Sequence, residues 1–226
     1  AFDPGFLGGV TVAGGVTRMG GKTTSVLLCG AGSGAAPAVS VFDAVSGASK
    51  GAFYAFDRAF TGGVRVALSA PDANGASLVW VASAINSHVV AFNLDNFNTA
   101  VSSFYAFANT SVPNGVYLAA SLDHVVVGAS QGAISPQVSI FDFNGKFTKA
   151  FNPFDPAYAG GVRTALADYN RDGKLDIVVA SSLGAPGTVN VFNYQDLSLI
   201  DAFFISDSML GTDVANNFSG MGKVSW

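Results

Sequence analysis

Charged side chains are scarce in this sequence. Asp, Glu, Lys and Arg make up 12% of its 226 residues, about half the share of an average globular protein. The formal net charge is −4, and the lysines and arginines form no cluster. Because nucleic acids and anionic membranes are bound by concentrated positive charge, we expect neither as a partner. Hydrophobic residues reach 50%, which is ample material for the core of a folded protein.

Long apolar runs and cysteine pairs are also missing. No run of about 18 apolar residues is free of Gly, Asn or charge, so we expect no membrane-spanning helix. Cys29 is the one cysteine, which excludes an internal disulfide framework. Its apolar neighbours favour a small buried strand residue over a reactive thiol or an interchain bridge. The first residue is Ala1 rather than Met, and we expect a processed chain or a segment of a longer one.

What the sequence has instead is glycine in a repeating pattern. Gly-Gly-Val occurs at residues 8–10, 62–64 and 160–162, and Asn-Gly-Val occurs at 114–116. The valines are separated by 54, 52 and 46 residues, and a Phe-rich segment precedes each copy. These segments are residues 2–6, 53–56, 104–107 and 151–154. A period near 50 residues is typical of the blades of a β-propeller.

Each period contains four short apolar runs bounded by Gly, Asn, Ser or Pro, and we expect each run to form a strand. The expected strands are 10–13, 26–29, 39–42, 52–56; 64–68, 78–82, 89–92, 103–107; 116–120, 125–128, 138–141, 149–154; and 162–166, 177–180, 189–192, 202–205. The second run of each period is apolar on both faces, which indicates burial between neighbouring blades. Helical spacing is absent throughout.

The predicted fold class is therefore all-β: a β-propeller of four-stranded antiparallel blades, forming one domain over residues 1–226. Four complete blades are expected at about residues 8–56, 62–107, 114–154 and 160–205. Residues 1–6 and 206–226 are expected to build a composite or partial fifth blade, since a ring closes well when both termini share a blade. The alternative is an open fragment of a longer propeller.

The densest chemistry lies at Asp168-Tyr-Asn170-Arg-Asp172-Gly173-Lys174-Leu-Asp176. Oxygen-bearing side chains at alternate positions, a glycine at the sixth and a carboxylate at the ninth suit a loop around a hard cation such as Ca²⁺. An EF-hand is excluded because Val179 stands where its twelfth-position Glu belongs. Oxygen-only donors fit Ca²⁺ better than zinc or copper. The competing interpretation is a solvated Asx-type turn without an ion.

These residues resemble the FG-GAP, or VCBS, repeat family, the blade unit of integrin-α-like propellers. The resemblance covers roughly residues 1–205 and is carried by Gly-Gly-Val-Arg at 62–65 and 160–163, Gly-Ala-Pro at 184–186 with its partner at 34–37, Val-x-Val/Ile-Phe-Asp at 39–43 and 138–142, and the cation loop. It implies that Asp168, Asn170, Asp172 and Asp176 supply side-chain oxygens to Ca²⁺ and that Lys174 supplies a backbone carbonyl. The corresponding loops of the other three periods have lost the pattern.

Other candidate residues favour structural roles. We expect the Phe and Tyr clusters to pack between blades rather than to form platforms for sugars. His88 and His124 have no carboxylate or cysteine at ligand spacing and are expected to be ordinary loop residues. Arg65 and Arg163 occupy the same repeat position, which favours pairing with a neighbouring Asp or with backbone carbonyls.

No catalytic motif for nucleophilic, zinc or phosphate chemistry is present, so an enzyme is not expected. We expect a secreted or cell-surface module, with Ca²⁺ at one blade, that serves assembly as a fibre or layer subunit, or adhesion. Its expected partners are further copies of itself as a homo-oligomer or filament, or an extracellular protein or glycan. The alternatives are a lectin-like propeller and, with less support, a carbohydrate-active enzyme.

Overall fold

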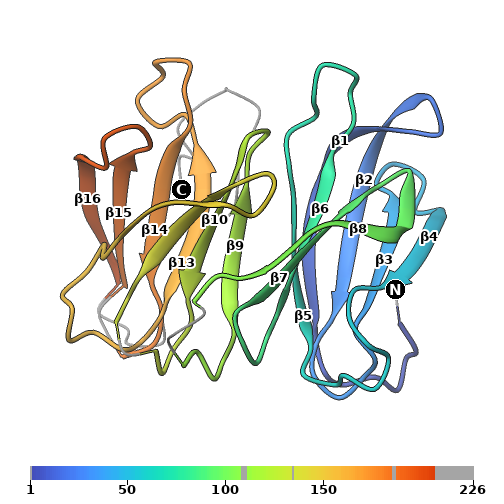
Figure 1. The fold of residues 1–226 in the computed structure, drawn as a ribbon, viewed down its shortest axis with the longest axis horizontal. Coiled ribbons are helices and arrows are strands. Elements are labelled where there is room, and N and C mark those ends of the chain that lie inside the picture. The colour runs from blue at the N-terminus through green and yellow to red at the C-terminus, as the bar shows by residue number, and fades with distance from the viewer. Residues whose placement is uncertain (1, 108–110, 134, 185–186, 207–226) are drawn as a thin grey trace.

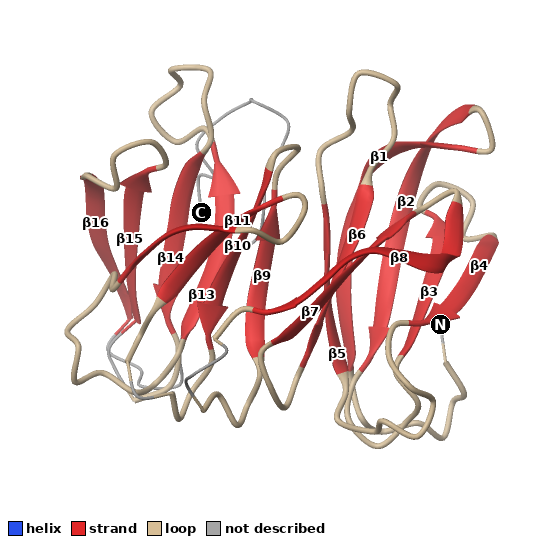
Figure 2. Cartoon of the chain, viewed as in Figure 1, coloured by secondary structure: helices blue, strands red, loops and turns tan. Residues whose placement is uncertain are grey.

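The computed structural model describes residues 2–107, 111–133, 135–184 and 187–206. Within them the chain forms sixteen β-strands in four four-stranded antiparallel sheets, each made of consecutive strands. Strands and loops account for all of this part of the chain (Figure 2). No helix in these ranges is long and apolar enough to cross a membrane. The four sheets are the blades of a β-propeller, as the repeat predicts.

The strands follow the period of the sequence. Blade 1 contains β1 Val10–Met19, β2 Lys22–Ala31, β3 Ala38–Asp43 and β4 Ser49–Tyr54. Blade 2 contains β5 Val64–Leu68, β6 Leu78–Ser83, β7 His88–Asn93 and β8 Asn96–Tyr105. Blade 3 contains β9 Val116–Ala120, β10 His124–Ala129, β11 Val138–Asp142 and β12 Phe147–Phe151. Blade 4 contains β13 Val162–Ala167, β14 Asp176–Ser181, β15 Gly187–Asn193 and β16 Leu199–Ser206.

The blades stand side by side in chain order, from blade 1 in blue to blade 4 in orange and red (Figure 1). The first strands of consecutive blades are neighbours: β1 contacts β5, β5 contacts β9, and β9 contacts β13. We call the face of a blade that packs on the next blade its far face, and the opposite face its near face. Because side chains alternate along a strand, each blade has one set of residues for each face.

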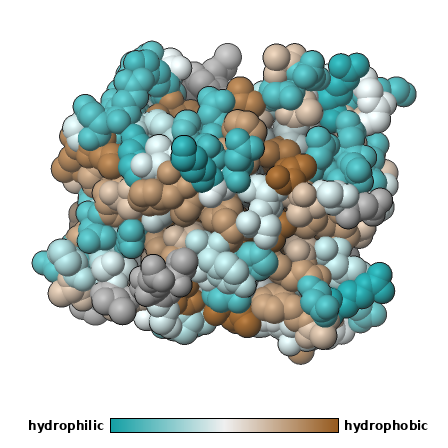
Figure 3. All heavy atoms as spheres, viewed as in Figure 1, coloured by the Kyte–Doolittle hydropathy of each residue, from teal (hydrophilic) through white to brown (hydrophobic). Residues whose placement is uncertain are grey.

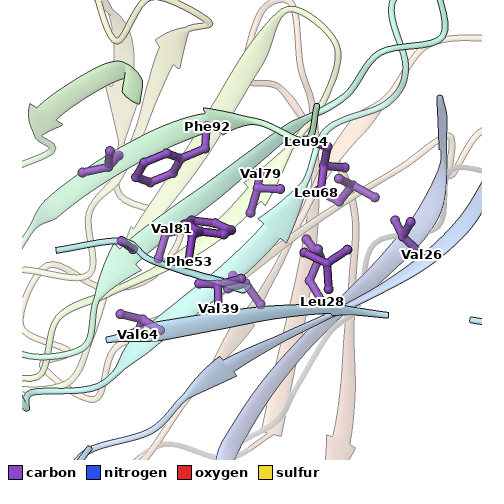
Figure 4. Close-up of a cluster of buried hydrophobic side chains, with 14 residues drawn as sticks. Val26, Leu28, Val39, Phe53, Val64, Leu68, Val79, Val81, Phe92 and Leu94 are labelled. Atoms are coloured by element: carbon purple, nitrogen blue, oxygen red, sulfur yellow. The ribbon is translucent and has the colours of Figure 1, made fainter. Parts of the chain in front are cut away.

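The core consists of three hydrophobic clusters, one at each junction between consecutive blades. At the first junction, Val26 and Leu28 on the far face of blade 1 pack against Val64, Leu68 and Val79 on the near face of blade 2 (Figure 4). In blades 2–4 the second strands β6, β10 and β14 are buried on both faces, as their two-sided apolar sequences predict. The three clusters of the core therefore lie between blades.

An aromatic pair spans each of the three junctions. A Phe from the fourth strand of one blade lies on a Phe from the third strand of the next blade, an arrangement that we call the aromatic clasp. The pairs and their ring-centroid distances are Phe53–Phe92 at 4.8 Å, Phe104–Phe141 at 4.5 Å and Phe151–Phe192 at 4.8 Å. The expectation that the aromatic clusters pack between blades is confirmed for these residues.

In blades 2–4 the glycine that precedes the valine of the repeat lies where the blade meets the loop of the blade before it. Gly63, Gly115 and Gly161 have φ angles of 83°, 70° and 91°. A Cβ atom on Gly63 would lie 2.6 Å from the backbone nitrogen of Ser33 in blade 1, and Gly115 and Gly161 have equally close backbone neighbours. The repeat therefore needs glycine for its left-handed backbone and for the close approach of two blades.

Two expectations need correction. The fourth strands begin earlier than the sequence indicates, most of all β8, which starts at Asn96 rather than at Ser103. These outer strands begin in exposed residues, so hydrophobicity does not mark their start. The fifth blade is not supported at its N-terminal half, because residues 2–9 form no strand and Phe6 closes a turn by donating its backbone N–H to the carbonyl of Asp3. Residues 207–226 lie outside the described residues.

Candidate functional site

The candidate cation loop connects the first two strands of blade 4. Strand β13 ends at Ala167 and β14 begins at Asp176, so residues 168–175 form the loop at the position that the sequence predicts. Arg171 and Gly173 adopt positive φ angles of 62° and 83°. These two left-handed residues turn the chain sharply and direct successive side chains toward the inside of the loop.

Backbone N–H groups of the loop point at its carboxylates. Asp168 accepts from the nitrogens of Asp172 at 3.0 Å and Gly173 at 3.1 Å. Asn170 Oδ1 accepts from Asp172 N at 2.9 Å, and Asp172 Oδ1 accepts from Lys174 N at 2.8 Å. The predicted ligand residues are thus brought into one small loop whose own hydrogen bonds fix its shape.

Asp176 is the most deeply buried of the predicted ligands, at 1% exposed. Its Oδ2 accepts the backbone N–H of Tyr169 at 3.1 Å. Burial raises the pKa of this carboxyl, and the nearby Asp172 and Asp168 raise it further, while the backbone hydrogen bonds oppose the shift. None of these three carboxylates forms an ion pair with a described residue, so their mutual repulsion is left without a cationic side chain.

The loop fits Ca²⁺ by donor chemistry. It offers carboxylate, amide and carbonyl oxygens, carboxylates that have no ion-pair partner among the described residues, and a buried carboxylate at its end. Across the described residues, no three His, Cys, Asp or Glu side chains converge closely enough to hold a metal ion by themselves. The carboxylates are engaged with the loop's own N–H groups, and Asn170 and the carbonyl of Lys174 belong to the predicted donor set. The arrangement is that of a hydrogen-bonded Asx-type loop with the donors of a Ca²⁺ site.

The corresponding connections in the other blades differ, as their sequences indicate. In blade 2, Asp72 accepts from the nitrogens of Asn74 at 2.8 Å and Ala76 at 2.9 Å, which is the same kind of turn without the outer carboxylates. Blade 1 extends β1 and β2 into a long hairpin that turns at residues 20–21. Blade 3 shortens the connection to residues 121–123. Blade 4 alone among the four keeps the carboxylates at both ends of the loop.

A cavity of about 280 Å³ lies beside the cation loop, between blades 3 and 4. Its walls come from the loop end at residues 174–176, from the turn at 121–124 and from the turn at 193–195. The turn at 193–195 is fixed by Lys149, whose Nζ donates hydrogen bonds to the backbone carbonyls of Tyr194 and Gln195. The Tyr194 hydroxyl is buried without a hydrogen-bond partner among the described residues, and burial raises its pKa. The cavity is not evident from the sequence, because three separate loops build it.

The histidines begin strands rather than lie in loops, which corrects the expectation for both. His88 starts β7 and stacks on Tyr105 with ring centroids 4.6 Å apart, and its Nε2 lies 2.9 Å from Ser103 Oγ. His124 starts β10 and lies 5.0 Å from the ring of Tyr194. Burial lowers the pKa of both imidazoles, so the neutral forms are favoured.

The expected structural role of Arg65 is confirmed. Its Nη1 donates to the carbonyls of Asn114 at 2.9 Å and Val116 at 3.1 Å in the next blade. The guanidinium groups of Arg65 and Arg163 lie 4.2 Å and 4.6 Å from the ring centre of Tyr117. Cys29 is buried in β2, as its sequence context predicts. Arg65, Arg163 and Tyr117 thus join neighbouring blades to each other.

The near face of blade 1 is an open apolar surface that the sequence did not reveal. Val12 is 63% exposed, whereas Val66 at the same position of blade 2 is 9% exposed. Leu27 on the neighbouring strand is 39% exposed, whereas Val79 at the corresponding position is fully buried. Hydrophobic residues also reach the surface elsewhere, as the view in Figure 3 shows in brown. The valines of β1 and β5 are alike in sequence, and only the presence of a neighbouring blade distinguishes them.

Comparisons with known proteins agree with the fold. Neither a scan against protein-family models nor a search of curated proteins gives a match. Among solved structures, the chain is similar to Kuenenia stuttgartiensis hydrazine synthase, with 14% identity, 91% of this chain and 51% of that chain covered, and a TM-score of 0.58. It is also similar to dihydro-heme d1 dehydrogenase NirN in complex with DHE, with 11% identity, 80% and 36% covered, and a TM-score of 0.52.

A third similar structure is AztD from Citrobacter koseri, with 13% identity, 92% of this chain and 49% of that chain covered, and a TM-score of 0.50. The chain spans about half the length, or less, of the solved chains that it matches. At sequence identities this low, the similarity supports the fold of this chain and does not indicate that it shares the activities of those proteins. The chain has a β-propeller fold, and the part of it that the structure describes forms four four-stranded blades.

Proposed function

We propose that this protein is a non-enzymatic assembly module of the extracellular space, a propeller of the FG-GAP type that associates through an open blade face and binds Ca²⁺ at blade 4. The observation that carries the proposal is the near face of blade 1. Val10, Val12 and Val16 on β1 and Leu27 on β2 expose apolar surface where the near faces of blades 2–4 are covered. Burial of such surface drives association.

The low charge of the chain supports the same role. Val12, Leu27 and Phe42 on the near face carry no charge, so a partner can cover these side chains without removing ions from water. At the end of β4 the guanidinium of Arg58 lies 4.6 Å from the ring centre of Tyr54. The acidic composition of the chain favours solubility. The surface therefore combines the properties of a blade junction with those of a soluble protein.

Ca²⁺ has a supporting part in this proposal. An ion bound by Asp168, Asn170, Asp172, the carbonyl of Lys174 and Asp176 neutralises the repulsion among the three carboxylates and fixes the connection between β13 and β14. Blades 1–3 lack the complete set of donors and rely on packing. The ion therefore stiffens one blade and leaves the docking face to hydrophobic contact.

Sedimentation velocity over a range of protein concentrations tests the proposal, with Ca²⁺ present and with a chelator. We expect concentration-dependent association in both conditions, and we expect the Ca²⁺-loaded protein to be the more stable one. A protein that stays monomeric at every concentration, with and without Ca²⁺, contradicts the assembly function.

A carbohydrate-binding role is the second candidate, and the cavity beside the cation loop favours it. The cavity lies near the lower end of the size range of small-molecule sites, about 300–1,000 Å³, and combines the polar groups of Asp123, Lys174 and Gln195 with apolar walls. A glycan-binding screen separates the two functions. Binding that is lost on Gln195→Ala and kept on Leu27→Glu supports the cavity, whereas an empty screen leaves the assembly function in place.

A further inference from the structure

The geometry points to a head-to-tail contact between two copies of this chain, in which the near face of blade 1 receives the far face of blade 4 of a second copy. The central interaction is a fourth aromatic clasp, between Phe42 of one copy and Phe203 of the second copy. This inference rests on the proposed assembly function and specifies its partner and its orientation.

The strand register shows that Phe203 is equivalent to the clasp residues of the earlier blades. Phe53 in β4 lies opposite Val39 in β3, and Phe203 in β16 lies opposite Val189 in β15. Phe104 and Phe151 occupy the same position relative to the third strands of blades 2 and 3. Directly opposed residues of an antiparallel pair share one face of the sheet, so all four rings belong to the far faces of their blades.

Phe42 is equivalent to the residues that receive a clasp. It ends the pattern Val-x-x-Phe of β3, and Phe92, Phe141 and Phe192 end the same pattern in β7, β11 and β15. Phe42 lies opposite Leu27, as Phe92 lies opposite Val79. It therefore belongs to the near face of blade 1, next to the exposed Leu27 side chain.

Both of these rings lack the partner that their equivalents have. Within the described ranges, neither Phe42 nor Phe203 has an aromatic contact, whereas the other three rings of each type are paired. Phe203 is 38% exposed, and Phe42 is half-buried. One chain thus presents one half of a clasp at each end of its row of blades, and the two halves lie on different faces.

The glycine of the first repeat has the same open environment. Gly9 has a φ of 79°, like its equivalents, yet a Cβ atom placed on it meets no atom within 4 Å. At Gly63 the same position is filled by the backbone of Ser33 from the preceding blade. The first blade is therefore shaped to receive the loop of another blade and has none from the described part of its own chain.

Most of the far face of blade 4 is closed, which restricts the contact to its outermost strand, β16. Ala165, Ala180, Val189 and Val191, on the first three strands of this face, are buried, whereas Phe203 on β16 is 38% exposed. The three observed clasps likewise use the fourth strand of the earlier blade. Asp201, on the same face of β16, accepts a hydrogen bond from the Tyr169 hydroxyl and so already has a polar partner.

A contact between two different faces can be tested by complementation. Leu27→Glu places a charge beside Phe42 and disables the near face, and Phe203→Glu disables the far face. Each variant keeps the other face intact. In sedimentation velocity we expect each variant alone to be monomeric at concentrations where the wild type associates, and an equimolar mixture of the two to form a one-to-one complex. Val101→Glu, at a residue of β8 that is 53% exposed, serves as the control and is expected to associate like the wild type.

The outcomes separate this inference from the proposed function. If the wild type associates and the mixture of the two variants stays monomeric, the head-to-tail contact is wrong and the assembly function stands. If the wild type never associates, both are wrong. Association of either variant alone at the wild-type level also overturns the contact. If circular dichroism shows that a glutamate variant is unfolded, Phe42→Ala and Phe203→Ala replace the two variants, because they remove the clasp without adding a charge. We expect the same complementation from this pair.

Discussion

The ring of Phe53 in blade 1 lies 4.8 Å from the ring of Phe92 in blade 2, and it also stacks on Phe97 at 4.9 Å with an angle of 9° between the planes. A single side chain on an outer strand thus joins two blades. The same relationship recurs at the next two junctions. Aromatic side chains bury large areas and prefer offset or edge contacts, so these pairs contribute much of the interaction between otherwise small residues.

Loss of a clasp residue is expected to destabilise the propeller. Phe141 is 4% exposed at the junction of blades 2 and 3, and Phe141→Ala is expected to lower the free energy of unfolding by about 3–5 kcal/mol because it leaves a cavity. Phe143, two residues along and exposed, is the control, and Phe143→Ala is expected to change stability by less than about 0.5 kcal/mol. Urea denaturation measures both. Equal effects of the two substitutions would show that the clasp has no special contribution.

Ca²⁺ is expected to stabilise the wild type and to lose this effect when Asp172 is replaced. At a Ca²⁺ concentration about 100 times the dissociation constant, linkage gives about 2.7 kcal/mol of added stability. Thermal unfolding with Ca²⁺ and with a chelator measures the difference, and Asp172→Ala is expected to abolish it.

Asp72→Ala is the matched control for this experiment. Asp72 and Asp172 each accept a backbone N–H at 2.8 Å within equivalent loops, so both substitutions remove a turn-forming acceptor. Only Asp172 belongs to the predicted donor set, and we expect Asp72→Ala to keep the full Ca²⁺ response. A Ca²⁺ response that survives in Asp172→Ala would place the ion elsewhere.

The glycines of the repeat are expected to respond unequally to substitution. Gly9→Ala forces a left-handed conformation on alanine, which costs about 1–2 kcal/mol. Gly63→Ala has the same cost and adds a 2.6 Å contact between its Cβ atom and the Ser33 backbone, so its loss of stability is expected to be clearly larger. Denaturant titration of the two monomeric variants compares them. If Gly9→Ala is the more destabilising change, then the first repeat already packs against another blade.

Alkaline pH is expected to weaken the link between blades 3 and 4. Tyr158 donates its hydroxyl to the carbonyl of Leu183 at 3.2 Å, and burial raises its pKa from 10.0 to about 12. Since the folded protein favours the neutral phenol, this contribution is complete below pH 10 and is lost as the pH rises toward 12. Tyr158→Phe is expected to remove the dependence and to cost about 1 kcal/mol at neutral pH. Phenolate absorbance during a pH titration measures the pKa, and a value near 10 would contradict the burial.

The propeller was predictable because its blades repeat. The valines after Gly9, Gly63, Gly115 and Gly161 each begin an innermost strand, and the cation loop lies between β13 and β14 as the pattern indicates. The outer strands were harder to place, because residues such as Asn96 at the start of β8 are polar and exposed. Hydrophobic periodicity indicates which side chains are buried, and the outer strands begin in residues that are exposed.

The open face and the cavity could not be predicted from the pattern. Val12 and Val66 occupy equivalent positions in similar sequences, and their difference in exposure arises only because a blade covers one and not the other. The cavity depends on three turns, near His124, Lys174 and Tyr194, that are far apart in sequence. Both features arise from the way the blades are arranged in space. The sequence of a single repeat does not show this arrangement.

We expect the near face of blade 1, which is open in the single chain, to become covered by a second copy at high protein concentration. Hydroxyl-radical footprinting of Leu27 and Phe42 at low and high protein concentration tests it most directly, because the reaction depends on the access of solvent to each side chain. We predict strong labelling of both residues at low concentration and protection at high concentration, with labelling of Val101 unchanged. Equal labelling of Leu27 and Phe42 at all concentrations would show that no second copy covers this face.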